Sequence, residues 1–395
     1  MYRFIIILLF YGCQDPNAQR VYPTEDFFEK IKYEDHKGKI LIPVELHGRT
    51  FKFIFDTGGL FVVSTKVQEH CHFDTLGTRK INGINGLSRK FNKLDIPEAR
   101  IESLEFKNFE ALLLDLFDKP PGMCIGADGL IGRDFLKDFI VQINGPRKEI
   151  IFTNDIKKLN IEGAKRTKLY FNKRRLTTPY LEIKINDRIT TKVEFDTGTN
   201  KLLSMDSDDA KMLIEKNLFT SEEIITHQGV QSIGASGVVP PSKPSYQFNI
   251  KSLEIGDIEL RDFYSDPSLV YKGRIGTGLL KYGIVTLDYQ KKRFYFQQFE
   301  NNPQVEKFET LGFGLLYVDG EVIISSLIEG GEAEQKGLFQ GAVVTSLSGK
   351  SLTDLSEEVA CEIFNNLDKS DMSREVTFTT KSDSSVTVVI NRQEY

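Results

Sequence analysis

Two aspartates occupy matching sequence contexts, and carboxyl groups can transfer protons. Residues 53–58 read Phe-Ile-Phe-Asp-Thr-Gly and residues 193–198 read Val-Glu-Phe-Asp-Thr-Gly, so that Asp56 and Asp196 each end an apolar run. One Asp-Thr-Gly sequence is ordinary turn chemistry. Two copies within a longer repeat predict carboxylates that face each other, and such a pair can share a proton and perform acid–base catalysis.

Other landmarks recur in the same order, which predicts two copies of one β-rich unit over about 40–152 and about 178–296. We call these the first repeat and the second repeat. The recurring landmarks are a serine after the triad, two glycines three residues apart, and an Ile-Gly sequence: Ser64 and Ser204, Gly83-Gly86 and Gly234-Gly237, and Ile131-Gly132 and Ile275-Gly276. The glycine pairs are predicted to form hairpin tips or loops.

Each aspartate is predicted to end the second strand of a hairpin. In the first repeat the strands are 39–46 and 51–55, and in the second repeat they are 180–185 and about 190–195. Each carboxyl group would therefore lie where a buried strand enters a tight loop. Two kinds of residue support that loop. Glycine permits a sharp turn at Gly58 and Gly198, and the hydroxyl groups of Thr57 and Thr197 can each hydrogen-bond the opposite loop.

These residues resemble the pepsin and retropepsin family of aspartic proteases. In that family each lobe carries a hydrophobic-hydrophobic-Asp-Thr-Gly sequence, a glycine-tipped flap hairpin and a later hydrophobic-hydrophobic-Gly strand, and all three occur in order in both repeats. The resemblance implies a mainly β, bilobal fold with pseudo-symmetric lobes at 37–155 and 176–298. It implies an aspartic endopeptidase that acts on a polypeptide through an activated water, without metal or cofactor. The implied catalytic residues are Asp56, Asp196, Thr57, Thr197, Gly58 and Gly198, and the implied flap or loop residues are Gly83, Gly86, Gly234 and Gly237.

Two departures from the family pattern support an alternative function. Gly59 has no side chain to hydrogen-bond the first carboxylate, and no flap tyrosine is found near Gly83 or Gly234. The alternative is a peptide-binding scaffold on the same fold that is catalytically weak or inactive. Tight peptide binding that Asp→Asn changes leave unaffected, with no cleavage product, would support this alternative over an active protease.

Residues 308–393 resemble a bacterial PDZ domain, a small α+β unit. A Gly-Phe-containing loop precedes a strand at 321–327 and a helix at about 355–366. The resemblance implies that the loop offers backbone N–H groups to a peptide C-terminus and that an adjoining strand pairs with the peptide. The alternative is a small β-rich cap without a ligand. The loop residues are Leu311, Gly312, Phe313 and Gly314.

Residues 1–13 resemble a bacterial lipoprotein signal, with one positive charge, a short apolar run and a small residue before Cys13. An exported protein is expected, periplasmic or at the cell surface and anchored to a membrane by lipid on Cys13. An ordinary export signal and an N-terminus without a signal are the alternatives. Residues 14–36 are predicted to be irregular.

The charge and the cysteine content bear on the expected partners, metal sites and disulfides. With 51 basic and 56 acidic residues, the formal net charge of −5 gives no electrostatic reason to expect a nucleic acid partner. Three cysteines follow Cys13, so at least one is unpaired, and no pair has zinc-ligand spacing. The sequence therefore predicts no disulfide framework and leaves open which of Cys71, Cys124 and Cys361 are oxidised.

Overall fold

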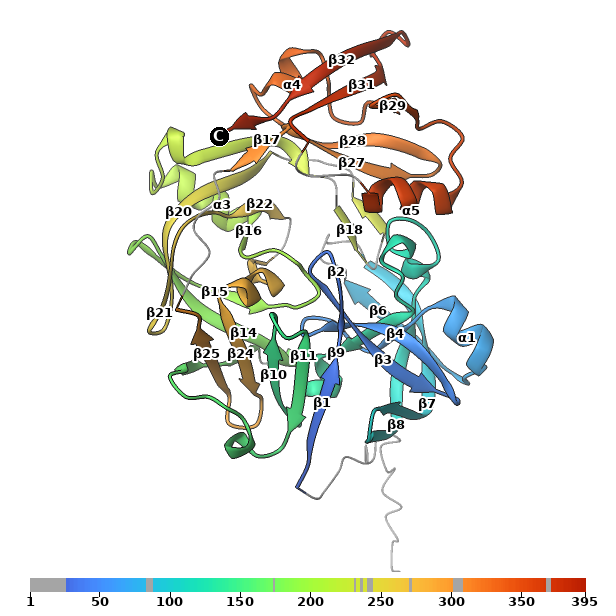
Figure 1. The fold of residues 1–395 in the computed structure, drawn as a ribbon, viewed down its shortest axis with the longest axis vertical. Helices are drawn as coiled ribbons and strands as arrows, with labels where there is room; N and C mark the ends of the chain where they lie inside the picture. Colours follow the sequence, from blue (N-terminus) through green and yellow to red (C-terminus); the bar gives the residue numbers. More distant parts are fainter. Residues whose placement is uncertain are drawn as a thin grey trace, which may run out of the picture.

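The computed structural model describes residues 26–82, 88–172, 175–230, 232–234, 237–239, 244–269, 272–300, 308–366 and 371–395. The described chain is mainly β, which confirms the predicted class (Figure 1). Its helices are short: α1 (Thr65–Cys71), α2 (Arg133–Leu136), α3 (Ser207–Glu215), α4 (Glu332–Gln335) and α5 (Glu357–Asn366), with 3₁₀ turns η1 (Asp115–Phe117), η2 (Met123–Ile125), η3 (Ile156–Lys158), η4 (Ser221–Glu223) and η5 (Thr277–Lys281). No helix among the described residues has the length and apolar character to cross a bilayer.

The first repeat forms an eight-stranded sheet. In spatial order its strands are β2 (Glu34–His36), β3 (Lys39–Leu46), β4 (Arg49–Asp56), β9 (Gly129–Gly132), β5 (Val62–Val63), β8 (Leu104–Leu113), β7 (Ser88–Ile101) and β6 (Thr75–Asn82). His47 and Gly48 join β3 to β4 with positive φ angles of 47° and 74°, the backbone that a two-residue hairpin turn requires.

The second repeat belongs to an eleven-stranded sheet. Its main path is β22 (Asp266–Leu269), β16 (Ser204–Asp206), β23 (Arg274–Ile275), β15 (Ile189–Phe195), β14 (Arg175–Ile185), β20 (Ser245–Ile255), β17 (Ile224–Val230), β28 (Glu321–Ile328) and β27 (Phe313–Val318); β13 (Tyr170–Asn172) pairs with β14, and β21 (Ile258–Tyr264) pairs with β20. The last two strands of the path come from the C-terminal part of the chain.

The strand pairing around the two aspartates is the same in both repeats. β4 and β9 pair in parallel, as do β15 and β23. Asp56 is the last residue of β4, and Asp196 directly follows β15. The next strand, β5 or β16, pairs antiparallel with β9 or β23. The sequence repeat therefore corresponds to a repeated arrangement of strands.

A six-stranded sheet joins the two repeats beneath these strands, at the bottom of Figure 1. Its order is β1 (Phe28–Lys32), β11 (Glu149–Thr153), β10 (Ile140–Asn144), β24 (Gly283–Asp288), β25 (Arg293–Gln298) and β12 (Lys165–Lys168). The central pair, β10 with β24, takes one strand from each repeat. The prediction that 14–36 is irregular is wrong for β1 and β2, because Ile31 and Tyr33 alternate with exposed lysine and glutamate and are buried.

Residues 308–395, which we call the C-terminal unit, have a separate hydrophobic core that includes Val322, Ile324, Val376 and Phe378. Besides β27 and β28, the unit contains the pair β26 (Glu309–Thr310) and β33 (Gln393–Glu394), and a four-stranded sheet of β30 (Lys350–Ser351), β29 (Val344–Leu347), β31 (Ser373–Thr379) and β32 (Ser385–Asn391). The helix predicted at about 355–366 is α5.

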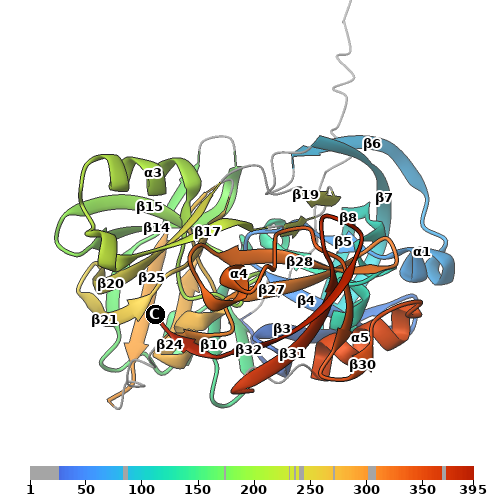
Figure 2. The same ribbon diagram turned by 90° about the horizontal axis from the view of Figure 1, so that it is seen from above.

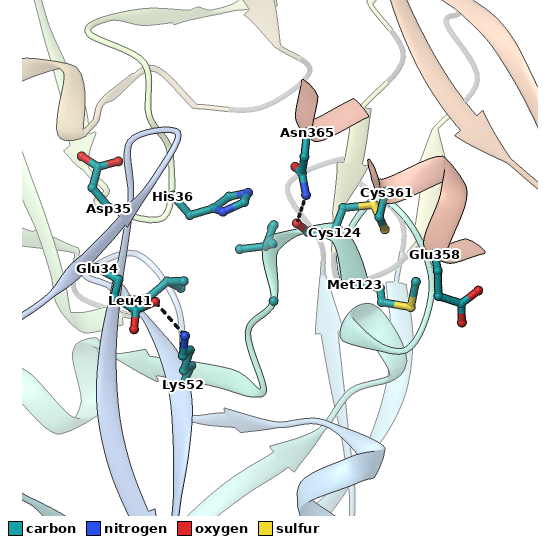
Figure 3. Close-up of a pocket in the computed structure, with 12 residues that line it drawn as sticks. Glu34, Asp35, His36, Leu41, Lys52, Met123, Cys124, Glu358, Cys361 and Asn365 are labelled. Atoms are coloured by element: carbon teal, nitrogen blue, oxygen red, sulfur yellow. Dashed lines mark hydrogen bonds and ion pairs between the residues drawn. A yellow bond between two sulfur atoms is a disulfide. The ribbon is translucent and has the colours of Figure 1, made fainter. Parts of the chain in front are cut away.

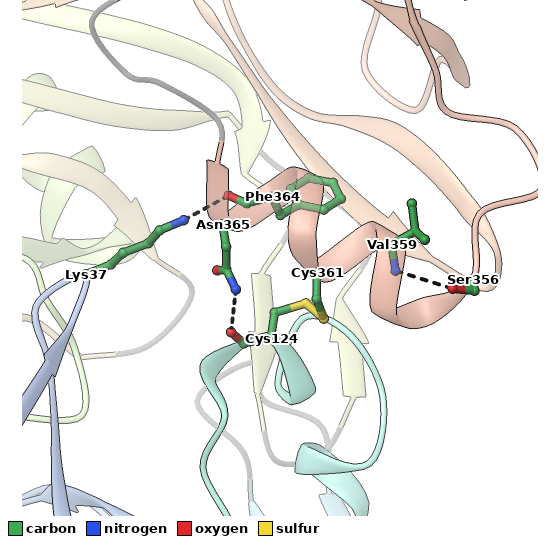
Figure 4. Close-up of a disulfide and its surroundings, with 7 residues drawn as sticks. All are labelled: Lys37, Cys124, Ser356, Val359, Cys361, Phe364 and Asn365. Atoms are coloured by element: carbon green, nitrogen blue, oxygen red, sulfur yellow. Dashed lines mark hydrogen bonds between the residues drawn. A yellow bond between two sulfur atoms is a disulfide. The ribbon is translucent and has the colours of Figure 1, made fainter.

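The C-terminal unit is attached to both repeats. β28 pairs with β17 of the second repeat, and the Tyr264 hydroxyl donates a hydrogen bond to the Tyr395 carbonyl oxygen at 2.9 Å. On the other side, a disulfide joins Cys361 of α5 to Cys124 of the first repeat, and Asn365 Nδ2 donates to the Cys124 carbonyl oxygen at 3.0 Å (Figure 4). The sequence did not predict this cross-link. Seen from above, the unit lies over both repeats (Figure 2).

Candidate active site

Two threonines lock the aspartate loops together through reciprocal hydrogen bonds. Thr57 Oγ1 donates to the Phe195 carbonyl oxygen and Thr197 Oγ1 donates to the Phe55 carbonyl oxygen, each at 2.7 Å. Each hydroxyl also accepts the backbone N–H of the other threonine at 3.0 Å. Both threonines are completely buried. The structure therefore brings the two predicted triads together in a two-fold arrangement.

The glycines of the triads let the carboxyl groups approach each other. A Cβ atom on Gly58 would lie 2.7 Å from Asp196 Cγ, and one on Gly198 would lie 2.6 Å from Asp56 Cγ. Neither position can carry a side chain, because real Cβ contacts are longer than this. Each glycine N–H also donates to the aspartate of its own loop at 2.9 Å, to Asp56 Oδ1 and Asp196 Oδ1.

Gly59 has no side chain to hydrogen-bond the first carboxylate, but its backbone makes such a bond. Its backbone N–H donates to Asp56 Oδ1 at 2.8 Å, so this carboxylate accepts two backbone hydrogen bonds. A Cβ on Gly59 would lie 2.5 Å from Asp56 Oδ2, so a side chain there would displace the carboxylate. The two backbone N–H groups therefore fix the orientation of the Asp56 carboxylate.

Burial and two neighbouring charges set the pKa of Asp196. Burial and, after it, the Asp56 carboxylate raise this pKa to about 7, against the Arg274 guanidinium, which lowers it. Arg274 Nε lies 3.2 Å from Asp196 Oδ2, within ion-pair distance, but its N–H direction does not complete a hydrogen bond. The Asp196 carboxyl group therefore keeps its proton to near neutral pH, beside the Asp56 carboxylate.

Two further basic side chains hold the aspartate loops. The Lys39 ammonium donates to the Gly198 carbonyl oxygen, and the Arg133 guanidinium donates to the Gly58 carbonyl oxygen. Burial lowers the pKa of Lys39, while the nearby carboxylates of Asp196 and Asp56 oppose that change. A positive charge thus lies within electrostatic reach of both carboxyl groups.

The other predicted site residues lie elsewhere or outside the described chain. Gly234 and Gly237 pair across the hairpin of β18 (Ser232–Gly234) and β19 (Gly237–Val239), in agreement with a glycine-tipped hairpin. Gly83, Gly86 and Cys13 lie outside the described residues, and so does the whole segment 1–13.

Of the predicted peptide loop of the C-terminal unit, Leu311 and Gly312 lie between β26 and β27, whereas Phe313 and Gly314 begin β27. Gly312 has a positive φ of 77°, its N–H donates to Thr310 Oγ1 at 3.2 Å, and its carbonyl oxygen accepts the Ile328 N–H at 2.8 Å. Leu311 and Phe313 pack on the core of the unit, and Gly314 opposes Ser326 in the β27–β28 pair. These residues are not part of the aspartate site.

A hollow of about 550 Å³ lies between the first repeat and α5, and neither aspartate lines it (Figure 3). Its lining includes His36, Glu358 and both sulfur-bearing residues of the disulfide, Cys124 and Cys361. The disulfide can therefore be reached from this hollow. Among the residues that the structure describes, no group of three or more His, Cys, Asp or Glu side chains is placed to hold a metal ion.

Comparison with known proteins finds a partial family match and distant structural neighbours. The aspartyl protease family matches residues 42–135, which contain Asp56 but less than half of the chain. The matching solved structures include Basic 7S globulin from soybean, which is 10% identical with a TM-score of 0.41, over 70% of this chain and 95% of its own chain. They also include an aspartic proteinase from Irpex lacteus, which is 12% identical with a TM-score of 0.43, over 70% of this chain and 99% of its own chain. No curated protein matches.

Sequence reasoning missed the basic side chains around the aspartates. Arg274 was visible as the first residue of the second Ile-Gly strand, where the first repeat has Leu130. Lys39 and Arg133 gave no comparable signal, because their contacts with Gly198 and Gly58 depend on the tertiary arrangement.

Proposed function

We propose that the chain is an aspartic-type endopeptidase with two lobes, at 37–155 and 176–298, and a PDZ-like domain at 308–393. The reciprocal hydrogen bonds of Thr57 and Thr197 carry this proposal, since they hold two carboxyl groups face to face in loops that exclude side chains. The repeated strand pairing around each aspartate supports the two lobes. Substrate would be a polypeptide bound in extended form between them.

The proposed mechanism uses one proton shared by the pair. The ionised carboxylate takes a proton from a bound water, which attacks the scissile carbonyl carbon while the protonated carboxyl group donates to the carbonyl oxygen. Two N–H donors to Asp56 and the deeper burial of Asp196 favour Asp56 as the base and Asp196 as the acid. Protonation of the amine by the dyad then releases both peptide products.

The test is cleavage of a denatured protein mixture between pH 3 and pH 8, with and without pepstatin. Wild type should cleave, and Asp56→Asn and Asp196→Asn should lose at least about 1000-fold in rate, because each removes an essential proton acceptor or donor. Asp262→Asn is the matched control, since Asp262 is exposed and has a positive φ of 49° that asparagine tolerates. Full activity in both dyad variants would disprove the assignment.

The pH profile gives a second reading of the same experiment. Because burial raises the pKa of Asp196 to about 7, cleavage should fall as the pH rises through about 7, where the pair loses its last proton. A rate that continues to rise to pH 8 would exclude the shared-proton mechanism.

A peptide-binding scaffold without turnover is the second candidate. Arg274, 3.2 Å from Asp196, stabilises the ionised form of that carboxylate, and a doubly ionised pair has no general acid. This function predicts peptide binding that Asp196→Asn leaves unchanged and no cleavage product by mass spectrometry.

The PDZ-like domain is proposed to bind a peptide C-terminus at Leu311, Gly312, Phe313 and Gly314. β27, which begins with the last two of these residues, is the last strand of its sheet, so a peptide strand can pair with its outer edge. Binding of C-terminal peptides to the full chain, and its loss when the peptide carboxylate is amidated, tests this part of the proposal.

Export with a lipid anchor on Cys13 is proposed from residues 1–13. The Cys124–Cys361 disulfide supports it, because such bonds persist in oxidising compartments outside the cytoplasm. Release of the Cys13→Ser protein from the membrane fraction would support the anchor, and unchanged fractionation would argue against it.

A further inference from the structure

The two aspartates have walls of opposite chemical character at equivalent positions. On the Asp56 side three neighbouring strands place Leu41, Ile54 and Leu130 in register, since Leu41 pairs with Ile54 and Ile54 pairs with Leu130. On the Asp196 side the equivalent strands place Tyr180, Glu194 and Arg274 in register in the same way. We call these sets the apolar wall and the polar wall.

Both walls lie on the same face of their strands as the aspartates. Side chains alternate between the two faces of a strand, so Glu194 and Asp196 share one face of the chain at the end of β15. Val193 and Phe195, which have the opposite orientation, belong to the main core. By the same alternation Ile54 lies on the same face of β4 as Asp56. Ile54 packs in a separate apolar cluster rather than in the main core.

The polar wall is a buried network of charges. Glu194 Oε1 accepts a hydrogen bond from the Tyr180 hydroxyl at 2.8 Å and lies 2.5 Å from Lys272 Nζ. Glu194 Oε2 lies 3.8 Å from Arg274 Nε. The side chains of Glu194 and Arg274 are each only 6% exposed, whereas that of Lys272 is 36% exposed, so the network runs from the buried side of Asp196 to the surface.

Arg274 is not satisfied by this network. Its Nε is buried without a hydrogen-bond acceptor, and the part of the chain that the structure describes offers the guanidinium two carboxylates as ion-pair neighbours but no acceptor in hydrogen-bond geometry. A buried guanidinium normally has such partners, because its five N–H donors are costly to leave unpaired. Glu194 is already shared with Lys272 and Tyr180, and Asp196 is shared with Asp56.

The charge balance near the polar wall is positive. Arg274 and Lys272 both face Glu194, and the single charge of a half-protonated aspartate pair is opposed by Lys39. One positive charge therefore remains for a group that enters beside Asp196. A carboxylate provides both the charge and the acceptors that a guanidinium prefers.

We propose that the polar wall selects an acidic substrate residue on one side of the scissile bond, while the apolar wall selects an apolar residue on the other side. This inference rests on the proposed protease function and names its substrate class. Arg274 and Glu194 are then specificity-determining residues, and Lys272 orients Glu194.

The test begins with a denatured peptide mixture whose cleavage sites are sequenced. Sites should carry an apolar residue on one side of the cut and Asp or Glu on the other. Paired hexapeptides that differ by Glu against Leu at that position should differ about 10- to 100-fold in kcat/KM.

The decisive variant is the double change Glu194→Ile with Arg274→Leu, which copies the apolar wall. It removes both charges together, since removing one alone would strand a buried charge. The acidic preference should disappear and the Leu peptide should become the better substrate. Arg274→Lys should keep part of the preference, and Lys251→Gln, an exposed lysine of the same repeat, should leave it unchanged.

Failure of this inference is distinguishable from failure of the proposed function. Cleavage that depends on Asp196 but shows no acidic preference, or a preference that survives the double variant, overturns the inference alone. If no Asp196-dependent cleavage occurs, the protease function fails, and calorimetric binding of the Glu and Leu hexapeptides tests the wall directly. Tighter binding of the Glu peptide, lost in the double variant, supports the wall, and equal binding overturns it.

Discussion

At the scale of single residues, the site depends on a few buried hydroxyl and carboxyl groups. Thr57→Val removes the donor to the Phe195 carbonyl oxygen and the acceptor for the Thr197 N–H, and leaves both of these groups buried without a partner. Each unsatisfied group costs about 1–3 kcal/mol. We expect a stability loss of about 2–4 kcal/mol and, because the carboxyl groups lose their alignment, a fall in kcat of about 100-fold.

Thr57→Ser is the matched control for this prediction, since it retains the hydroxyl. Denaturant unfolding and single-turnover cleavage measure the two effects. A Thr57→Val protein with the stability and kcat of the serine variant would show that the reciprocal hydrogen bonds do not organise the site.

The Asp196 carboxyl group should also make stability depend on pH. Burial raises its pKa to about 7 from an ordinary value of 3.8, so the folded chain binds this proton more tightly than the unfolded chain. Its stabilising contribution is complete below about pH 4 and is lost as the pH rises to about 7. Asp196→Asn imitates the protonated form, so it should melt several degrees above wild type at pH 8 and at the same temperature near pH 4.

Thermal unfolding of both proteins from pH 4 to pH 8 measures this difference, with Asp262→Asn as the exposed control. A melting-temperature difference that does not change with pH would mean that Asp196 does not hold a proton in the folded state near neutral pH.

At the scale of elements, local patterns explain what the sequence predicted and what it missed. The hairpins that end at Asp56 and Asp196 were predictable, because each aspartate follows three consecutive buried residues of a mainly apolar run and the turns use residues that accept positive φ. The pairing of β17 with β28 could not be predicted, since it joins segments about 100 residues apart and each strand reads as an ordinary strand. The disulfide was missed for the same reason, because no spacing rule relates Cys124 to Cys361.

Removing the disulfide should weaken the attachment of helix α5 to the first repeat, leaving hydrogen bonds such as that from Asn365 to the Cys124 carbonyl oxygen. Cys124 and Cys361 close a loop of 237 residues, and loss of a native disulfide typically costs about 2–5 kcal/mol. Cys361→Ser should therefore lower the melting temperature, and reductant should lower that of wild type to the same value. Cys71→Ala is the control, because Cys71 is buried and free and its variant should still respond to reductant.

At the scale of the whole molecule, three of the connections that hold the repeats together lie at different levels of the structure. They are the reciprocal threonine hydrogen bonds, the β10–β24 pair at the centre of the six-stranded sheet, and the C-terminal unit with its attachments to both repeats. The first two lie next to the aspartates or beneath them, and neither involves α5. In Figure 1 the C-terminal unit lies at the opposite end of the molecule from the six-stranded sheet.

This arrangement predicts that the geometry of the aspartate pair survives loss of the covalent link between the C-terminal unit and the first repeat. In the Cys361→Ser protein, Asp196-dependent cleavage of a hexapeptide should stay within about threefold of wild type, because an intact threonine network keeps the reacting groups aligned. Cleavage of a long denatured polypeptide should increase, since the unit keeps its strand pairing with the second repeat but can then move relative to the first repeat. The ratio of the two rates, with and without reductant, measures the effect, and a tenfold loss on the hexapeptide would show instead that the C-terminal unit itself aligns the two aspartates.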